Sequence, residues 1–177
     1  SIFANSGNLL VSFASSLRSK DSIALSEYGQ ITTEKGSNLS APNLIVGNDT
    51  PSSAFAYLGG HVQLNNTILK NYAQMYVSGE GNFGNITIQG TSSLLDFDGS
   101  TGKEIYTANS ITTNKKGQLQ IENGIFSAPS LRKMTSKAAD GSILLKNTGV
   151  LKTTTGQVFA KGINTSNDKK AKDSTGA

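Results

Sequence analysis

The amino-acid sequence predicts an all-β fold, a right-handed parallel β-helix (solenoid) with coils of about 22 residues. One repeated phrase is a small residue, then Asn or Gln, then an apolar residue. Its central positions are Asn8, Gln30, Gln74 and Gln118. The first two are one period apart, and each later one follows after two periods. A second phrase, Ser-Ala-Pro-X-Leu, occurs at residues 40–44 and 127–131, close to four periods apart. Because both phrases follow one period, a solenoid explains them better than a β-sandwich, which has similar strand spacing without the recurrence.

Composition fits this fold and removes several kinds of chemistry. The 177 residues include 19 Gly, 3 Pro and 36% hydrophobic side chains, which describes a single domain of strands and turns. There is no Cys, so disulfides, thiolate catalysis and cysteine zinc sites are excluded. No apolar run has the length of a membrane span, and no membrane insertion is expected. The net charge of +4 allows attraction to a polyanion, although scattered Lys also protect strand edges and keep a rod soluble.

The N-terminal part alternates strand patterns with turn signals. The β-like runs occupy residues 8–13, 22–26 and 30–33. Residues 13–22 carry a helical pattern, and we expect a short amphipathic helix there that caps the end of the stack. A loop with the turn signal Asn48-Asp49-Thr50-Pro51 is expected over residues 47–53.

The rest of the chain continues this series. Further strands, bounded by Gly, Asn or Ser, are expected at residues 54–58, 61–64, 67–69, 74–78, 85–89, 93–97, 104–107, 110–113, 142–146, 150–153 and 157–160, with one whole coil at 117–131. The solenoid domain is therefore expected to span residues 1–163. Residues 164–177 contain no apolar side chain larger than Ala, so a disordered tail or the start of a stalk is expected there.

Stacked coils bury apolar side chains in columns, one residue from each coil above its counterpart in the next. One expected column contains Leu9, Ile31, Met75, Phe97, Leu119 and Val158. The other contains Leu44, Ile68, Ile86, Ile111 and Leu131. In this register Leu119 lies between Phe97 and a residue near Ile143.

Several of these phrases resemble β-helical proteins of microbial surfaces. The stretches at residues 5–9 and 147–151, the Ser-Ala-Pro-X-Leu turns and Phe-Gly-Asn-Ile-Thr-Ile-Gln-Gly at 83–90 are similar to β-helical adhesins, including autotransporter passengers and fungal cell-wall adhesins. This resemblance implies a non-enzymatic, extracellular rod at the cell surface, used for adhesion or display, with a host or cell-surface glycan as partner. Residues 36–46 are similar to the coils of bactofilins, which implies instead a self-assembling structural solenoid joined through its terminal coils.

Few residues point to catalysis or to a metal. His61 is the single His, so a His-based metal site or triad lacks its second member. Asp96 and Asp98 could offer two carboxylates to Ca²⁺, but the rest of a calcium loop is missing and a turn is expected. On a regular strand the two carboxylates share one face and Phe97 points inward. We expect no catalytic, cofactor-binding or metal-binding residue; the enzymatic alternative is a polysaccharide-cleaving β-helix that uses paired carboxylates.

The same period applied to charge predicts a polyanion-binding edge. Lys115 and Lys137 are one period apart, and Lys161 follows at slightly more than one further period, so the three are expected near one edge of successive coils. Like charges placed together repel one another, which suggests an anion that bridges them. The further contributors to this edge are Lys116, Arg132 and Lys133. The expected partner is an anionic glycan or host surface molecule, and nucleic acid is not expected.

Overall fold

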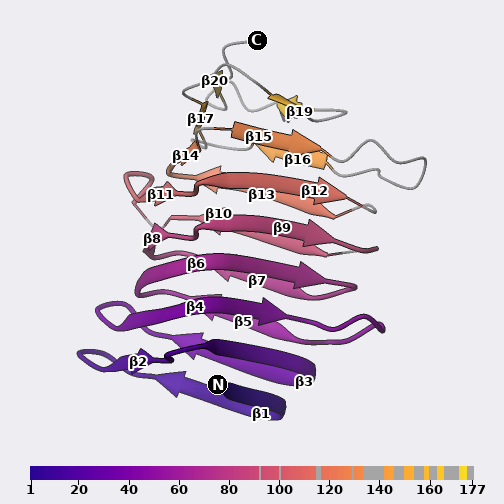
Figure 1. Ribbon diagram of the computed structural model, residues 1–177. Helices are drawn as coiled ribbons and strands as arrows, with labels where there is room; N and C mark the ends of the chain where they lie inside the picture. Colours follow the sequence, from indigo (N-terminus) through magenta and orange to yellow (C-terminus); the bar gives the residue numbers. More distant parts are fainter. Residues whose placement is uncertain are drawn as a thin grey trace.

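The structure is a computed structural model, and it describes residues 1–91, 93–99, 101–114, 117–128, 130–133, 142–145, 150–153, 158–159, 163–165 and 172–174. In these residues the regular structure consists of twenty strands, and every pair of bonded strands is parallel. The coils stack into a rod of about six turns that starts with β1 at one end (Figure 1). The described residues contain no helix that could cross a membrane. The predicted all-β solenoid is therefore confirmed.

Each coil contributes strands to three faces, which we call A, B and C. Face A contains the second halves of β1 (Ile2–Val11) and β3 (Ser22–Thr33), then β5 (Phe55–Leu58), β7 (Gln74–Val77), β10 (Leu94–Asp98), β13 (Gln118–Asn123), β16 (Ser142–Leu145) and β19 (Ile163–Thr165). Face B contains β2 (Ser16–Arg18), the first halves of β4 (Asn38–Val46) and β6 (His61–Lys70), then β8 (Glu80–Asn82), β11 (Ile105–Thr107), β14 (Ile125–Ala128), β17 (Val150–Thr153) and β20 (Lys172–Ser174). Face C contains the first halves of β1 and β3, the second halves of β4 and β6, then β9 (Asn85–Gln89), β12 (Ser110–Asn114), β15 (Ser130–Lys133) and β18 (Val158–Phe159).

The coil length predicted from the sequence is correct as an average, since stacked coils are about 22 residues apart. Single coils depart from this average because their corners differ in length. On face A the step from Ile31 to its partner Ala56 is longer than the period, and the next step, from Ala56 to Met75, is shorter. The right-handed winding stays an expectation from the crossover rule. The predicted boundary at residue 163 stays a prediction too, since most of residues 164–177 lie outside the described part.

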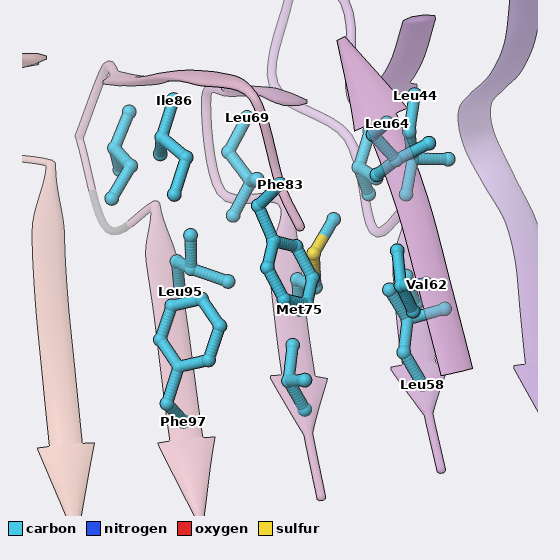
Figure 2. Close-up of a cluster of buried hydrophobic side chains, with 14 of the residues drawn as sticks. Leu44, Leu58, Val62, Leu64, Leu69, Met75, Phe83, Ile86, Leu95 and Phe97 are labelled. Carbon is cyan, nitrogen blue, oxygen red and sulfur yellow. The ribbon is translucent and has the colours of Figure 1, made fainter. Parts of the chain in front are cut away.

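The interior is built by alternation along each strand, with one side chain inward and the next outward. The inward residues form one continuous apolar cluster along the rod, and Figure 2 shows part of it in rows along the stack. Of the predicted interior residues, Leu9, Ile31, Met75 and Leu119 do share one column, and Leu119 pairs with Ile143 as expected. The register also confirms the second column at Leu44, Ile86, Ile111 and Leu131.

Three column assignments were wrong. Phe97 is buried but lies in the next inward row, between Val77 and Ile121, and Leu95 takes its place beside Leu119. Ile68 is outward, because buried Thr67 occupies the position between Leu44 and Ile86. Val158 belongs to face C, where it pairs with Leu131. A strict period cannot follow coils of unequal length, and a slip of one residue turns a side chain from inside to outside.

The expected capping helix at residues 13–22 was also wrong. Phe13 and Ala14 form a turn in which Ala14 has a φ of 60°, and β2 follows directly. Leu17 of β2 pairs with Leu39 of β4 and packs against the core. The inward pairing of Leu17 and the backbone bonds to the next coil therefore override the helical periodicity of this segment.

The interior changes character along the rod. In the first coils it is aliphatic, with Ile23, Leu25, Ile31 and Leu39 fully buried. Further along, four aromatic rings meet in the interior. The Phe97 ring centroid lies 5.0 Å from that of Phe83, 4.7 Å from that of Tyr106 and 4.7 Å from that of Phe126. Such edge-on and tilted contacts add about 0.5–1.5 kcal/mol per pair to the gain from burial.

The corner between faces B and C carries a line of hydrogen-bonded polar side chains, which we call the asparagine ladder. Its members are Ser22, Asn43, Asn66, Asn85 and Ser110, one from each of five successive coils. The Nδ2 of Asn43 donates to Ser22 Oγ (3.2 Å), that of Asn66 to Asn43 Oδ1 (2.9 Å) and that of Asn85 to Asn66 Oδ1 (3.2 Å). Ser110 Oγ donates to Asn85 Oδ1 (3.0 Å). Each amide is thus held by the coil before it and by the coil after it.

Candidate functional site

The corner between faces A and B is hollow. A cavity of about 570 Å³ and a neighbouring one of about 440 Å³ lie there, and both are lined by Tyr57 and Ser78. We call the two together the Tyr57 groove. Its lining comes from residues 35–38, 57, 59–61, 76–80, 98–99, 104 and 123, which belong to successive coils. Volumes of this size are within the range of small-ligand sites.

Glycine explains why the corner is hollow. A Cβ atom built on Gly59 would lie 2.8 Å from Thr33 O, one on Gly60 2.4 Å from Ser37 O, and one on Gly79 1.9 Å from Gly60 O. At such distances a side chain cannot fit unless backbone moves. The coils therefore stack backbone on backbone here, held by bonds such as His61 N to Ser37 O (2.8 Å) and Gly79 N to Leu58 O (3.0 Å). The floor of the groove consists of backbone, and the space above it is left open.

Aromatic rings form one wall of the groove. Tyr57 is 40% exposed and pairs across the sheet with Tyr76. The Tyr57 hydroxyl lies 2.9 Å from Ser78 Oγ, which holds the ring between the two cavities. Phe55 lies beside Tyr76 with their ring centroids 5.5 Å apart. Face A thus presents apolar ring surface next to a polar hollow.

The charged residues of the groove are mostly acidic. Lys35 and His61 belong to the larger cavity together with Glu80 and Glu104, and Asp98 lines the smaller one. Glu104 Oε1 accepts hydrogen bonds from Thr101 N and Thr101 Oγ1, both at 2.9 Å. Glu80 is exposed, and its carboxylate makes no hydrogen bond to another described residue. Glu80 is therefore the carboxylate best able to meet a ligand.

Tyr106 lies behind these carboxylates in the interior. Burial is the largest cause that raises the pKa of its hydroxyl well above the ordinary tyrosine value, and the charges of Glu104, Asp98, Asp96 and Glu80 raise it further. The hydroxyl stays protonated and donates to Asn123 O at 3.4 Å. Tyr106 is therefore a supporting residue of the acidic wall.

Phe97 lies in the core as predicted, but the strand is not regular there: Asp98 is exposed, whereas Asp96 is buried, and the register with β13 shifts between Phe97 and Asp98. Asp96 Oδ2 accepts from Gln120 Nε2 at 2.9 Å, and Asp98 Oδ1 accepts from Asn123 Nδ2 at 2.6 Å. In the part of the chain that the structure describes, no group of three metal-ligating side chains converges. Both carboxylates act in cross-strand hydrogen bonds.

The predicted polyanion edge falls largely outside the described residues, as Lys115, Lys116, Lys137 and Lys161 do. Arg132 and Lys133 end β15, where they pair with Thr112 and Thr113 of β12. The edge therefore stays a prediction.

Sequence reasoning missed the Tyr57 groove. The available signal was the Gly59-Gly60 pair and the Gly79-Glu80-Gly81 segment, which meet at the same corner one coil apart.

Comparison of the chain with profiles of known families, with curated proteins and with solved structures finds no match. The fold and the groove define the class of protein, a parallel β-solenoid with a lateral polar groove.

Proposed function

We propose that this protein is a non-enzymatic β-solenoid that binds a glycan in the Tyr57 groove. The observation that carries the proposal is the combination in one hollow of an exposed tyrosine ring, an open backbone floor and polar side chains. A sugar ring has an apolar C–H face and a rim of hydroxyl groups. The ring of Tyr57 suits the face, and Asn38, Ser78 and Glu80 suit the rim.

The proposal includes a role in adhesion or display outside the cell. A solenoid is stiff along its axis and presents an extended side surface, and that surface is where the groove lies. The cell-surface location follows from the resemblance to β-helical adhesins.

Replacing the central ring tests the proposal. Tyr57→Ala should lower the affinity for the best-bound neutral or charged oligosaccharide at least tenfold, with β-rich circular dichroism unchanged. Tyr28→Ala is the matched control, because Tyr28 is 67% exposed at another corner. Equal affinities for both variants and the unchanged protein would remove the groove as the binding site. Release of new reducing ends from the oligosaccharide would favour the polysaccharide-cleaving alternative.

A self-assembling solenoid is the second candidate, and the first coil favours it. Among the described strands β1 pairs with β3 alone, so its other edge is open. Phe3, Leu10 and Phe13 are exposed there at 76%, 59% and 73%. An open, apolar strand edge invites pairing with another chain. Sedimentation at rising protein concentration separates the two functions, because a polymer grows with concentration and a displayed monomer does not.

A further inference from the structure

The Tyr57 groove has the opposite charge to the chain as a whole. The chain carries a formal net charge of +4. Among the described residues that line the groove, one is cationic, Lys35, against the three carboxylates of Glu80, Glu104 and Asp98, a formal charge of −2 with His61 neutral. The groove is therefore a local acidic site on a basic rod.

Resting on the proposed function, we infer that the ligand is an amine-bearing glycan, a polymer or oligomer of hexosamine whose amino groups are free and protonated. The site itself is defined by the two cavities and by Tyr57, and the charge decides which sugar they take. A polyanionic glycan would meet repulsion from the carboxylates. A neutral glycan would make no charge-assisted contact with the exposed Glu80.

The contacts available to an ammonium group support this choice. Glu80 is exposed at the rim of the larger cavity and can accept a charge-assisted hydrogen bond, which is stronger than a neutral one. The ring of Tyr57 lies in the same cavity, and a cation over a tyrosine face is attracted by the ring. An acetylated amine loses both contacts because it carries no charge.

The test is isothermal titration of the full chain with three hexasaccharides: a glucosamine hexamer, its N-acetylated counterpart and a heparin fragment. Below the amine pKa, the glucosamine hexamer should bind at least tenfold more tightly than the acetylated one, and the difference should vanish once the amines are neutral. Glu80→Gln should weaken glucosamine binding about fivefold, in line with an exposed ion pair of about 1 kcal/mol. Asp49→Asn removes the same charge at an exposed site on another corner and should change nothing.

The outcomes separate this inference from the proposed function. If the acetylated hexamer binds as tightly and Tyr57→Ala still abolishes binding, the groove is a glycan site and the inferred ligand class is wrong. A heparin fragment that binds best and depends on Tyr57 overturns the inference in the same way. If none of the three binds, the proposed function fails and the inference fails with it.

Discussion

The two corners that flank face B are built in opposite ways. The asparagine ladder connects its corner with side chains, one per coil, each bonded to the next. The Tyr57 groove has glycine at the equivalent turns, and its coils touch through backbone. A side-chain ladder fixes the spacing and register of every coil that contributes to it. A backbone corner fixes the spacing as well, yet leaves room outside that a ligand can enter.

Both corners contribute to stability, but only the groove corner leaves space in which a ligand can bind. Both corners rest on one interior, so a change there should destroy both. Changes at a single corner should separate folding from binding.

The largest effect is expected in the shared interior. Leu119 is fully buried, and its strand pairs it with Leu95 on one side and Ile143 on the other. Leu119→Asp should abolish folding, because a buried, unpaired carboxylate costs several kcal/mol, comparable to the whole stability of a domain. Circular dichroism melting checks this against Gln118→Asp at the adjacent, half-buried position. A cooperative melt unchanged by Leu119→Asp would show that the register is wrong.

At the groove corner the floor should tolerate no side chain. Gly79→Ala places a Cβ where Gly60 O lies 1.9 Å away, so the coils must separate. We expect a loss of about 2–3 kcal/mol in urea unfolding, typical of overpacking. Ser78→Ala, the neighbouring change, removes only the bond to the Tyr57 hydroxyl and should cost under about 1 kcal/mol. Similar losses from both variants would contradict the close backbone packing.

The predicted lysine edge is basic, in contrast to the acidic lining of the Tyr57 groove. Reversing Lys115, Lys137 and Lys161 to Glu should reduce binding to immobilised heparin at least tenfold, and binding by the unchanged protein should weaken between roughly 50 and 300 mM salt. Reversing Arg18, Lys20 and Lys35 is the control, and it includes Lys35 of the groove lining. Equal losses from the two triple variants would show that heparin binding depends on the net charge of the protein and not on this edge.

At the ladder corner a smaller loss is expected. Asn66→Ala removes the bonds to Asn43 and Asn85 and should cost about 1–2 kcal/mol in urea unfolding. Glycan affinity should stay the same, since the groove lies at another corner. Asn65→Ala changes the exposed residue next to it and should have almost no effect on stability. Loss of glycan affinity in Asn66→Ala would show that the two corners are coupled.

The smallest effect concerns the hydroxyl of Tyr57. Tyr57→Phe keeps the ring and removes the contact to Ser78, so stability should fall by less than about 1 kcal/mol. Glycan affinity, measured by titration, should fall far less than in Tyr57→Ala. If the two variants bind equally poorly, the hydroxyl and not the ring is the essential group.

The sequence predicted the positions of side chains that depend only on the average coil length. It misplaced the side chains whose positions depend on the length of a single coil. Met75 and Leu119 were placed in one column correctly because the two steps between them, one shorter and one longer than the average, together make two periods. Ile68 and Phe97 were misplaced where the coils depart from it, since side-chain direction reverses with each residue. The groove was missed because it exists only where corners of different length meet. Its glycines are visible in the sequence, but their contacts with the coil below are not.

The early coils should separate from the rod more easily than the coils that contain the aromatic rings. Each coil contacts only its neighbours, so a solenoid can open from an end one coil at a time. The first coils hold together through aliphatic contacts, whereas Phe83, Phe97, Tyr106 and Phe126 join several coils through their rings. Under a force applied to the N-terminal end, the early coils would unfold first, and unfolding would stop at this aromatic cluster. Of the residues that line the Tyr57 groove, Asp98, Gly99 and Glu104 lie next to the cluster in sequence, whereas Lys35 and Asn38 belong to the early coils. Mechanical load would therefore open the groove from its N-terminal side, and the affinity for a ligand would fall before the remaining coils unfold.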